Sequence, residues 1–216
     1  MVNPANTRTE DRGLTLEALT GERGLAPVFS ALDLRIQDGE LIQIVGANGS
    51  GKSTLLRIIA GLMDPESGSV HWQAEDIHGA GRALFQADCF YLGHKNAVAE
   101  DLTAIENLEY FLKVRGVKGK CRCGEALEAV AYSASLRAIA GKTSAGQKQR
   151  IALAKLLLVD VKVWLLDEPF TSLDAQGKSI VENLLYQHCR SGGIALVATH
   201  QSINIDPQYM RQITLT

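Results

Sequence analysis

The sequence predicts an α/β fold with a mostly parallel sheet, an antiparallel β part near the N-terminus and an inserted helical segment. Three observations predict this fold. Short apolar runs at 41–45, 161–166 and 194–199 are typical of buried parallel strands. A glycine-rich loop joins the first of these runs to a helical pattern. A second helical region fills most of 103–159, between strands on either side.

The first part of the chain alternates between strands and tight turns. Residues 28–36 alternate apolar and polar positions, as a half-buried strand does. The turn Gln37-Asp38-Gly39 separates this strand from the buried strand at 41–45. Beyond the glycine-rich loop we expect a helix over 52–61 and a strand over 69–72.

The second part of the chain has mainly helical patterns. The segment 103–140 carries four apolar residues on one helical face, namely Ile105, Leu108, Phe111 and Leu112. Another helix is expected over 149–159, before the strands at 161–166 and 194–199.

Composition narrows the class of protein. The chain has 216 residues, of which 46% are hydrophobic and 21% are charged, and its formal net charge is −2. These values are typical of a soluble globular domain and argue against a nucleic-acid-binding protein, which is usually basic. No secretory signal is recognisable, and no apolar run approaches the roughly 20 residues that span a bilayer. We expect a flexible tail over 1–13 and one domain over 14–216, with a helical subdomain inserted at about 95–160.

The cysteines and one basic stretch leave alternatives open. The four cysteines are Cys89, Cys121, Cys123 and Cys189. Only Cys121 and Cys123 lie close together, and their spacing matches no common zinc or disulfide pattern. We expect free thiols, and a metal site at Cys121 and Cys123 is the alternative. Basic residues recur from Lys113 to Arg122. They are interpreted as a solvated loop, with contact to anionic lipid headgroups as the alternative.

The strongest motif is a phosphate-binding loop. It fits the pattern G-x-x-x-x-G-K-[ST] with Gly46, Ala47, Asn48, Gly49, Ser50, Gly51, Lys52, Ser53 and Thr54. Glycines allow the backbone to curl so that N–H groups and the positive end of the following helix face phosphate oxygens. Lys52 supplies a full positive charge near the β- and γ-phosphates, and the Ser53 hydroxyl can bind Mg²⁺. The motif predicts a nucleoside triphosphate bound with Mg²⁺.

Two acidic residues follow a buried strand. Asp167 and Glu168 come directly after Trp164-Leu165-Leu166, at the edge of a parallel sheet where ligands bind. Adjacent side chains of a strand point to opposite faces, so we expect different roles for the two acids. Asp167 is suited to hold Mg²⁺ or its water, and Glu168 to orient and deprotonate an attacking water.

Three further segments resemble the ABC ATPases. Thr143-Ser144-Ala145-Gly146-Gln147 is similar to the L-S-G-G-Q signature in a relaxed form, and Ser172-Leu173-Asp174 is similar to the D-loop. His200 stands where the family has its switch histidine. The resemblance extends from about Leu14 to the C-terminus, and it implies an ATPase core in which Lys52, Glu168 and His200 act in catalysis.

The resemblance also implies a dimer with two bound ATP molecules. From the residues themselves, Ser144 is a good N-cap and Gly146 leaves N–H groups open, which makes a second anion site. In the family this site closes over the γ-phosphate held by a second copy. The implied ATP contacts outside the phosphate loop are Ser144, Ala145, Gly146, Gln147 and Asp174.

Several positions depart from the general ABC pattern. Ala145 replaces the first signature glycine, and Thr143 replaces leucine. Alanine costs little where φ is negative, so we expect hydrolysis to survive. No aromatic residue stands where the family stacks adenine. Arg23 is the nearest residue and its guanidinium can stack on a base, whereas Phe29 is expected in the core.

A histidine replaces the glutamine of the Q-loop, because Tyr91-Leu92-Gly93 is followed by His94. A neutral imidazole can also contact Mg²⁺ or the attacking water. With 101–108, Thr199-His200-Gln201 and the segments near 22–30, this feature resembles the CcmA family of cytochrome c maturation ATPases, also called haem exporter ATP-binding subunits. That family works at the cytoplasmic face of the bacterial inner membrane with CcmB, CcmC and the haem chaperone CcmE. We expect no nucleic-acid partner.

Alternative functions share the same catalytic residues. ATP closure can drive haem export, or it can release a haem-loaded chaperone without transport. A third possibility is the ATPase subunit of another small ABC transporter with a different substrate. A P-loop kinase is disfavoured by the signature segment and by His200.

Overall fold

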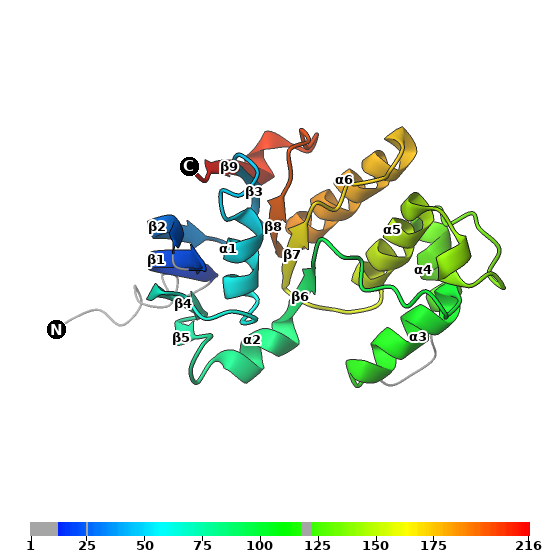
Figure 1. The fold of residues 1–216 in the computed structure, drawn as a ribbon, viewed down its shortest axis with the longest axis horizontal. Helices are drawn as coiled ribbons and strands as arrows, with labels where there is room; N and C mark the ends of the chain where they lie inside the picture. Colours follow the sequence, from blue (N-terminus) through cyan, green and yellow to red (C-terminus); the bar gives the residue numbers. More distant parts are fainter. Residues whose placement is uncertain (1–12, 25, 118–121) are drawn as a thin grey trace. The chain divides into compact units, whose positions relative to one another are not determined.

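The computed structural model describes residues 13–24, 26–117 and 122–216 (Figure 1). The expected tail over 1–13 therefore lies outside the described residues, except for Gly13. The chain divides into two compact units. The sheet unit contains the described residues of Met1–Tyr91, together with Val161–Asp167 and Leu185–Thr216, and the helical unit contains Leu92–Asp160 and Glu168–Leu184.

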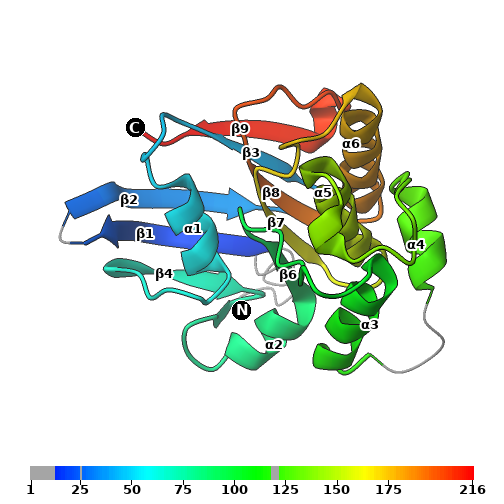
Figure 2. The same cartoon turned by 45° about the vertical axis from the view of Figure 1, so that its right-hand side comes forward.

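The sheet unit is built on two sheets. The first has the order β2-β1-β4-β5, and its strands pair antiparallel (Figure 2): β1 Leu14–Arg23, β2 Ala26–Ile36, β4 Ser67–Trp72 and β5 Glu75–Asp76. The second has the order β6-β7-β8-β3-β9 with β6 Cys89–Leu92, β7 Val163–Asp167, β8 Ile194–Ala198, β3 Leu41–Val45 and β9 Met210–Thr214. Strand β3 pairs parallel with β8 and β9, and β7 pairs parallel with β8.

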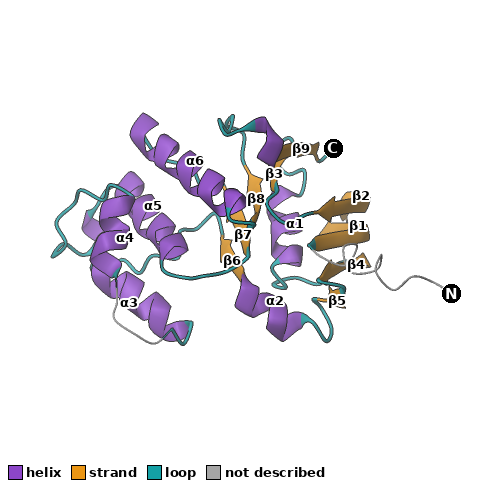
Figure 3. Ribbon diagram, turned by 180° about the vertical axis from the view of Figure 1, so that it is seen from behind, coloured by secondary structure: helices purple, strands orange, loops and turns teal. Residues whose placement is uncertain are grey.

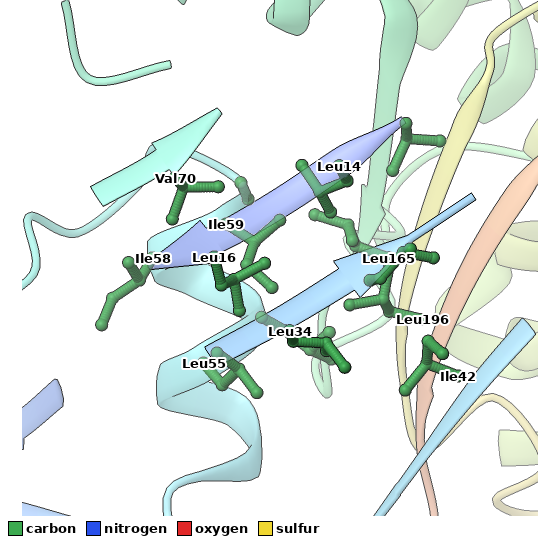
Figure 4. Close-up of a cluster of buried hydrophobic side chains, with 14 of the residues drawn as sticks. Leu14, Leu16, Leu34, Ile42, Leu55, Ile58, Ile59, Val70, Leu165 and Leu196 are labelled. Atoms are coloured by element: carbon green, nitrogen blue, oxygen red, sulfur yellow. The ribbon is translucent and has the colours of Figure 1, made fainter. Parts of the chain in front are cut away.

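The core of this unit lies around helix α1, Lys52–Ile59. Figure 4 shows Leu55, Ile58 and Ile59 of this helix in one hydrophobic cluster with side chains of β1, β2, β3, β4, β7 and β8. Helix α1 therefore packs on both sheets, which fixes the loop that precedes it. Every side chain of β7 and β8 is buried, because the parallel sheet is covered on its faces. Helix α2, Arg82–Asp88, leads into β6.

The helical unit is built on three helices that pack on one another (Figure 3). They are α3 Ala104–Val114, α4 Cys123–Ala129 and α5 Ala145–Ala154, and a 3₁₀ turn, Lys155–Leu157, continues α5. Thr103 and Glu106 form a capping box that starts α3. A longer helix, α6 Ala175–Arg190, begins in this unit and ends in the sheet unit.

The structure confirms the α/β class and the strands expected near 28–36, 41–45, 69–72, 161–166 and 194–199. The helical pattern expected over 103–140 is divided in the structure between α3 and α4, because Gly116 adopts a left-handed φ of 67° that ends α3. The helix expected from residue 149 begins four residues earlier, since the Ser144 side chain accepts a hydrogen bond from the Gln147 N–H. Strands β1, β5, β6 and β9, helix α2 and the long helix α6 were not predicted.

Two of the cysteine expectations hold and one fails. Cys89 and Cys189 are buried free thiols. Cys123 is disulfide-bonded, so free thiol is wrong there, and Cys121 lies outside the described residues. Lys118 and Lys120 of the basic stretch also lie outside them. Within the described ranges, no helix is long and apolar enough to cross a membrane.

Candidate functional site

The glycine-rich loop connects β3 to α1 in the sheet unit. Gly46 and Gly51 have φ values of 156° and 93°, and Gly51 is the N-cap of α1. A Cβ at Gly46 would lie 2.5 Å from the Leu215 carbonyl oxygen, and one at Gly51 would lie 2.8 Å from Val28 Cγ2. Only glycine fits these two positions. The loop thus leaves backbone N–H groups and a helix N-terminus open to an anion.

Lys52 lies across this loop. Its side chain is buried, and Nζ donates hydrogen bonds to the carbonyl oxygens of Gly46 at 2.8 Å and Ala47 at 2.9 Å. The Ser50 hydroxyl is buried nearby in the same loop and has no hydrogen-bond partner. A buried cation satisfied only by carbonyls, beside a hydroxyl without a partner, suits a phosphate group that brings its own oxygens.

Asp167 ends β7 at the carboxyl edge of the parallel sheet. Its side chain is 4% exposed, and its Oδ2 atom has no hydrogen-bond partner. Burial raises the pKa of the Tyr91 phenol; a hydrogen bond from Arg57 opposes this rise, and the charge of Asp167 adds to it. A buried carboxylate oxygen without a partner is costly unless a cation occupies the position. The environment of Asp167 therefore suits a divalent metal.

His200 follows β8 at the same sheet edge. Its Nε2 lies 3.0 Å from Oδ1 of Asn48 in the glycine-rich loop. The next residue is held by the buried Gln43, whose Nε2 donates to the Gln201 carbonyl at 2.9 Å. The structure thus places His200 beside the loop. Sequence reasoning did not single out Gln43, although a polar residue in an otherwise apolar strand was a signal.

The signature segment starts helix α5 in the helical unit. Ser144 caps the helix through its contact with the Gln147 N–H at 3.2 Å. A Cβ at Gly146 would lie 2.6 Å from the Ser172 carbonyl oxygen, so this glycine is required by its surroundings. Ala145 is an ordinary helical residue, which explains how alanine is tolerated there. The Gln147 Nε2 atom donates to the Ser133 hydroxyl at 3.0 Å.

The segment after β7 is held to α5 by two buried side chains. Gln149 donates to the Pro169 carbonyl at 2.7 Å. Arg150 donates to the Val130 carbonyl at 2.6 Å and pairs with Asp174 at 2.7 Å. Glu168 has a left-handed φ of 52°, a strained geometry for a non-glycine residue that surrounding contacts must maintain.

His94 and Glu168 line one cavity of about 490 Å³ in the helical unit. The other walls come from the segment after His94, the first turns of α5, and the segment after Glu168. His94 is exposed and Glu168 is half-buried, so both can meet a ligand that enters this cavity. Its lining also includes Ala145, Lys148 and Ser172.

The expected site residues thus form two groups. The loop residues 46–54, Asp167 and His200 share one edge of the parallel sheet in the sheet unit. His94, Glu168, Asp174 and the signature residues 144–147 belong to the helical unit. Phe29 is 6% exposed and belongs to the core, as expected, while Arg23 is exposed at the end of β1.

This fold and these motifs define a P-loop ATPase with an ABC signature. The family model described as ABC transporter matches residues 29–171, so the chain belongs to this family and is an ATP-binding ATPase.

Among relatives, it is 41% identical to "Cytochrome c biogenesis ATP-binding export protein CcmA" of Aliivibrio fischeri, over 94% of this chain and 98% of the relative. It is 40% identical to the protein of the same name from Vibrio cholerae, with the same coverage.

Two solved structures illustrate the fold. A dimeric ATP-binding cassette in a post-hydrolysis state, bound to ADP and Pi, is 25% identical with a TM-score of 0.78, over 94% of each chain. A putative ABC transporter ATP-binding protein from Pyrococcus furiosus is 24% identical with a TM-score of 0.80, over 94% of this chain and 96% of the other.

Proposed function

We propose that this ATPase is the energy-supplying subunit of an inner-membrane complex in c-type cytochrome biogenesis. It powers haem export or the release of a haem-loaded chaperone. The observation that carries the proposal is the 38–41% identity, over 94% of the chain, to several relatives that bear the name of a cytochrome c biogenesis export protein. The partners would be a CcmB-like integral subunit and CcmC- and CcmE-like haem-delivery proteins.

The sheet unit holds the triphosphate. The backbone of residues 46–54 and the Lys52 ammonium bind its β- and γ-phosphate oxygens. Mg²⁺ fits the donors present, because the Asp167 Oδ2 atom lacks a partner and the Ser53 hydroxyl lies at the start of α1. His94 is the third metal ligand that the sequence predicts. The ion, when bound, neutralises charge on the β- and γ-phosphates.

Hydrolysis requires a base and a sensor of the γ-phosphate. Glu168 follows the metal ligand directly and accepts a proton from the attacking water. Its left-handed φ places its carboxylate differently from that of a residue continuing the strand. His200, in contact with Asn48 of the loop, donates to the γ-phosphate and stabilises the charge that develops there.

A second copy of the chain completes the site. The open N-terminus of α5, with Ser144, Ala145, Gly146 and Gln147, closes over the γ-phosphate held by its partner, and Asp174 lies at the same interface. The dimeric ATP-binding cassette similar in fold supports this assembly. ATP binding closes the dimer, and phosphate release opens it, so the cycle can move a membrane subunit.

Deleting the gene tests the biological role. We expect loss of covalent haem bands on haem-stained gels, with b-type cytochromes unchanged by spectroscopy. Normal c-type bands would contradict the cytochrome role while leaving the ATPase assignment intact. Haem movement into membrane vesicles, measured beside haem-chaperone release, separates the two modes of action.

A further inference from the structure

The segment that follows His94 is held against α5 at two points. The Lys148 ammonium, in the second turn of the helix, pairs with the Glu100 carboxylate. Lys155, where α5 passes into the 3₁₀ turn, donates from Nζ to the Ala97 carbonyl at 2.7 Å. The two lysines are seven residues apart, which places them on one face of a helix two turns from each other. The segment therefore lies along the helix that begins with the signature.

A lysine is an unusual residue at position 155, because its charged side chain is buried. Its side chain is 5% exposed, and its ammonium lies 5.6 Å from the centre of the Phe111 ring. Among the described residues, no carboxylate forms an ion pair with it, and desolvation lowers the pKa of its ammonium to about 8. Burying a cation without a counter-ion is unfavourable for folding. Fold stability alone would favour an apolar side chain at this position.

The backbone that Lys155 binds is also strained. Ala97 has a left-handed φ of 48°, which costs a non-glycine residue about 1 kcal/mol. Such a conformation persists only where surrounding contacts hold it. The contact from Lys155 is one of these, and the next residues are fixed separately by Asn107, which bonds to both the N–H and the carbonyl of Ala99.

We propose that Lys155 and Lys148 are positioning residues, which tie the backbone after His94 to the signature helix so that the two move together. Lys155 fixes the turn at Ala97, three residues from His94, and Lys148 fixes Glu100. A membrane partner that displaces His94 then displaces α5 and its N-terminal anion site. The inference rests on the proposed role of His94, and it adds the side chains that transmit the movement.

The test is ATP hydrolysis by the full complex, purified from membranes through a tag on this chain. In Lys155→Met, kcat falls about tenfold, because His94 and the signature are no longer held in register. KM for ATP stays within about twofold, since the phosphate loop belongs to the other unit. The isolated variant melts within about 3 °C of the parent or above it, because a buried charge has been removed. Lys155→Arg, which keeps a charged donor, retains most of kcat.

Matched variants separate positioning from general damage. Lys113→Met, at an exposed lysine of α3, keeps parental kcat. In a His94→Ala background, Lys155→Met causes no further loss, because both act through the same residue. Glu100→Gln changes only an exposed carboxylate, so it leaves folding intact, and it lowers kcat about threefold by weakening the Lys148 contact.

Failure of the inference and failure of the role of His94 give different results. Parental kcat in both Lys155→Met and Glu100→Gln, with His94→Ala impaired, overturns the lysine contacts alone. An equal loss on adding Lys155→Met to the parent and to His94→Ala also overturns them. Parental activity of His94→Ala instead removes the role on which the inference rests.

Discussion

The two units differ in their buried polar atoms that lack a partner. Within the described part of the chain, these atoms lie mainly in the sheet unit, at Ser50, Tyr91, Trp164 and Asp167, and the helical unit has one, at Tyr132. Among the described residues, the sheet unit buries Gln43, Lys52, Asp167 and Thr199, and the helical unit buries Asn107, Gln149, Arg150 and Lys155. In the helical unit each of the four binds a loop carbonyl of the same unit. In the sheet unit they gather at the carboxyl edge of the parallel sheet, where one Asp167 oxygen remains without a partner.

This difference indicates which buried side chains bind a ligand and which hold loops in position. A polar group that donates to backbone carbonyls fixes a loop, as Gln43 does in the sheet unit and the four buried residues do in the helical unit. Lys52 also donates to loop carbonyls, and its positive charge remains available to a phosphate. A buried group with unused capacity is costly in the folded protein and becomes favourable when a ligand arrives. The sheet unit is therefore arranged to bind ATP, and the helical unit is arranged to hold His94, Glu168 and the signature in place.

Lys52→Ala tests the ATP-binding role of the sheet unit, and it should have the largest effect on ATP affinity. The loop loses its only ammonium, and the phosphate oxygens lose a charge-assisted contact. We expect ATP affinity to fall at least about 100-fold, measured with a fluorescent ATP analogue. Gly46, Asn48 and the rest of the loop remain, so the melting temperature changes little. Parental affinity would show that Lys52 is not part of the ATP site.

Glu168→Gln should separate binding from turnover. The amide cannot accept the proton of the attacking water, so kcat falls by about 10²- to 10⁴-fold. ATP still binds, and the ATP-bound form accumulates as a dimer in size-exclusion chromatography. Hydrolysis at the parental rate would rule out Glu168 as the base.

Asn107→Ala tests the positioning role of the helical unit, because it should lower stability without changing ATP affinity. The carboxamide bonds to Ala99, Leu102 and Thr103, and its removal leaves buried backbone groups without partners. We expect the free energy of unfolding to fall by about 2 kcal/mol in chemical denaturation, with ATP affinity unchanged. Gln176→Ala, at an exposed position of α6, serves as the control. A loss of ATP affinity comparable to that of Lys52→Ala would contradict the assignment of ATP binding to the sheet unit and of positioning to the helical unit.

The smallest expected change in the free energy of unfolding comes from Lys155, and this change depends on pH. Its pKa is about 8 in the folded chain and higher in the unfolded chain, so between these values the unfolded state binds more protons. Stability from this residue therefore rises as pH increases through 8. From pH 7 to pH 9 the parent should gain about 1 kcal/mol relative to Lys155→Met. A difference that stays constant with pH would show that Lys155 is not desolvated in solution.

The sequence predicted the candidate ligand-binding residues of both units better than the buried contacts that hold the helical unit together, for a physical reason. A phosphate site formed by backbone N–H groups needs glycines at fixed positions, so Gly46 and Gly51 were recognisable from the motif alone. Asp167 followed from its place after an apolar strand. The contacts of Asn107, Gln149, Arg150 and Lys155 join residues far apart in sequence, and a polar residue in a helical pattern does not reveal its partner. Helix α6 was not predicted, because the segment before it, Ser172-Leu173-Asp174, resembles a loop motif.

The most direct test is haem staining of cells whose only copy of the chain carries Glu168→Gln. ATP hydrolysis by this chain is proposed to power cytochrome c assembly, and this variant keeps the fold and ATP binding while removing turnover. We predict parental amounts of the protein and of b-type cytochromes, with no covalent c-type haem bands. Normal c-type bands in these cells would contradict the account.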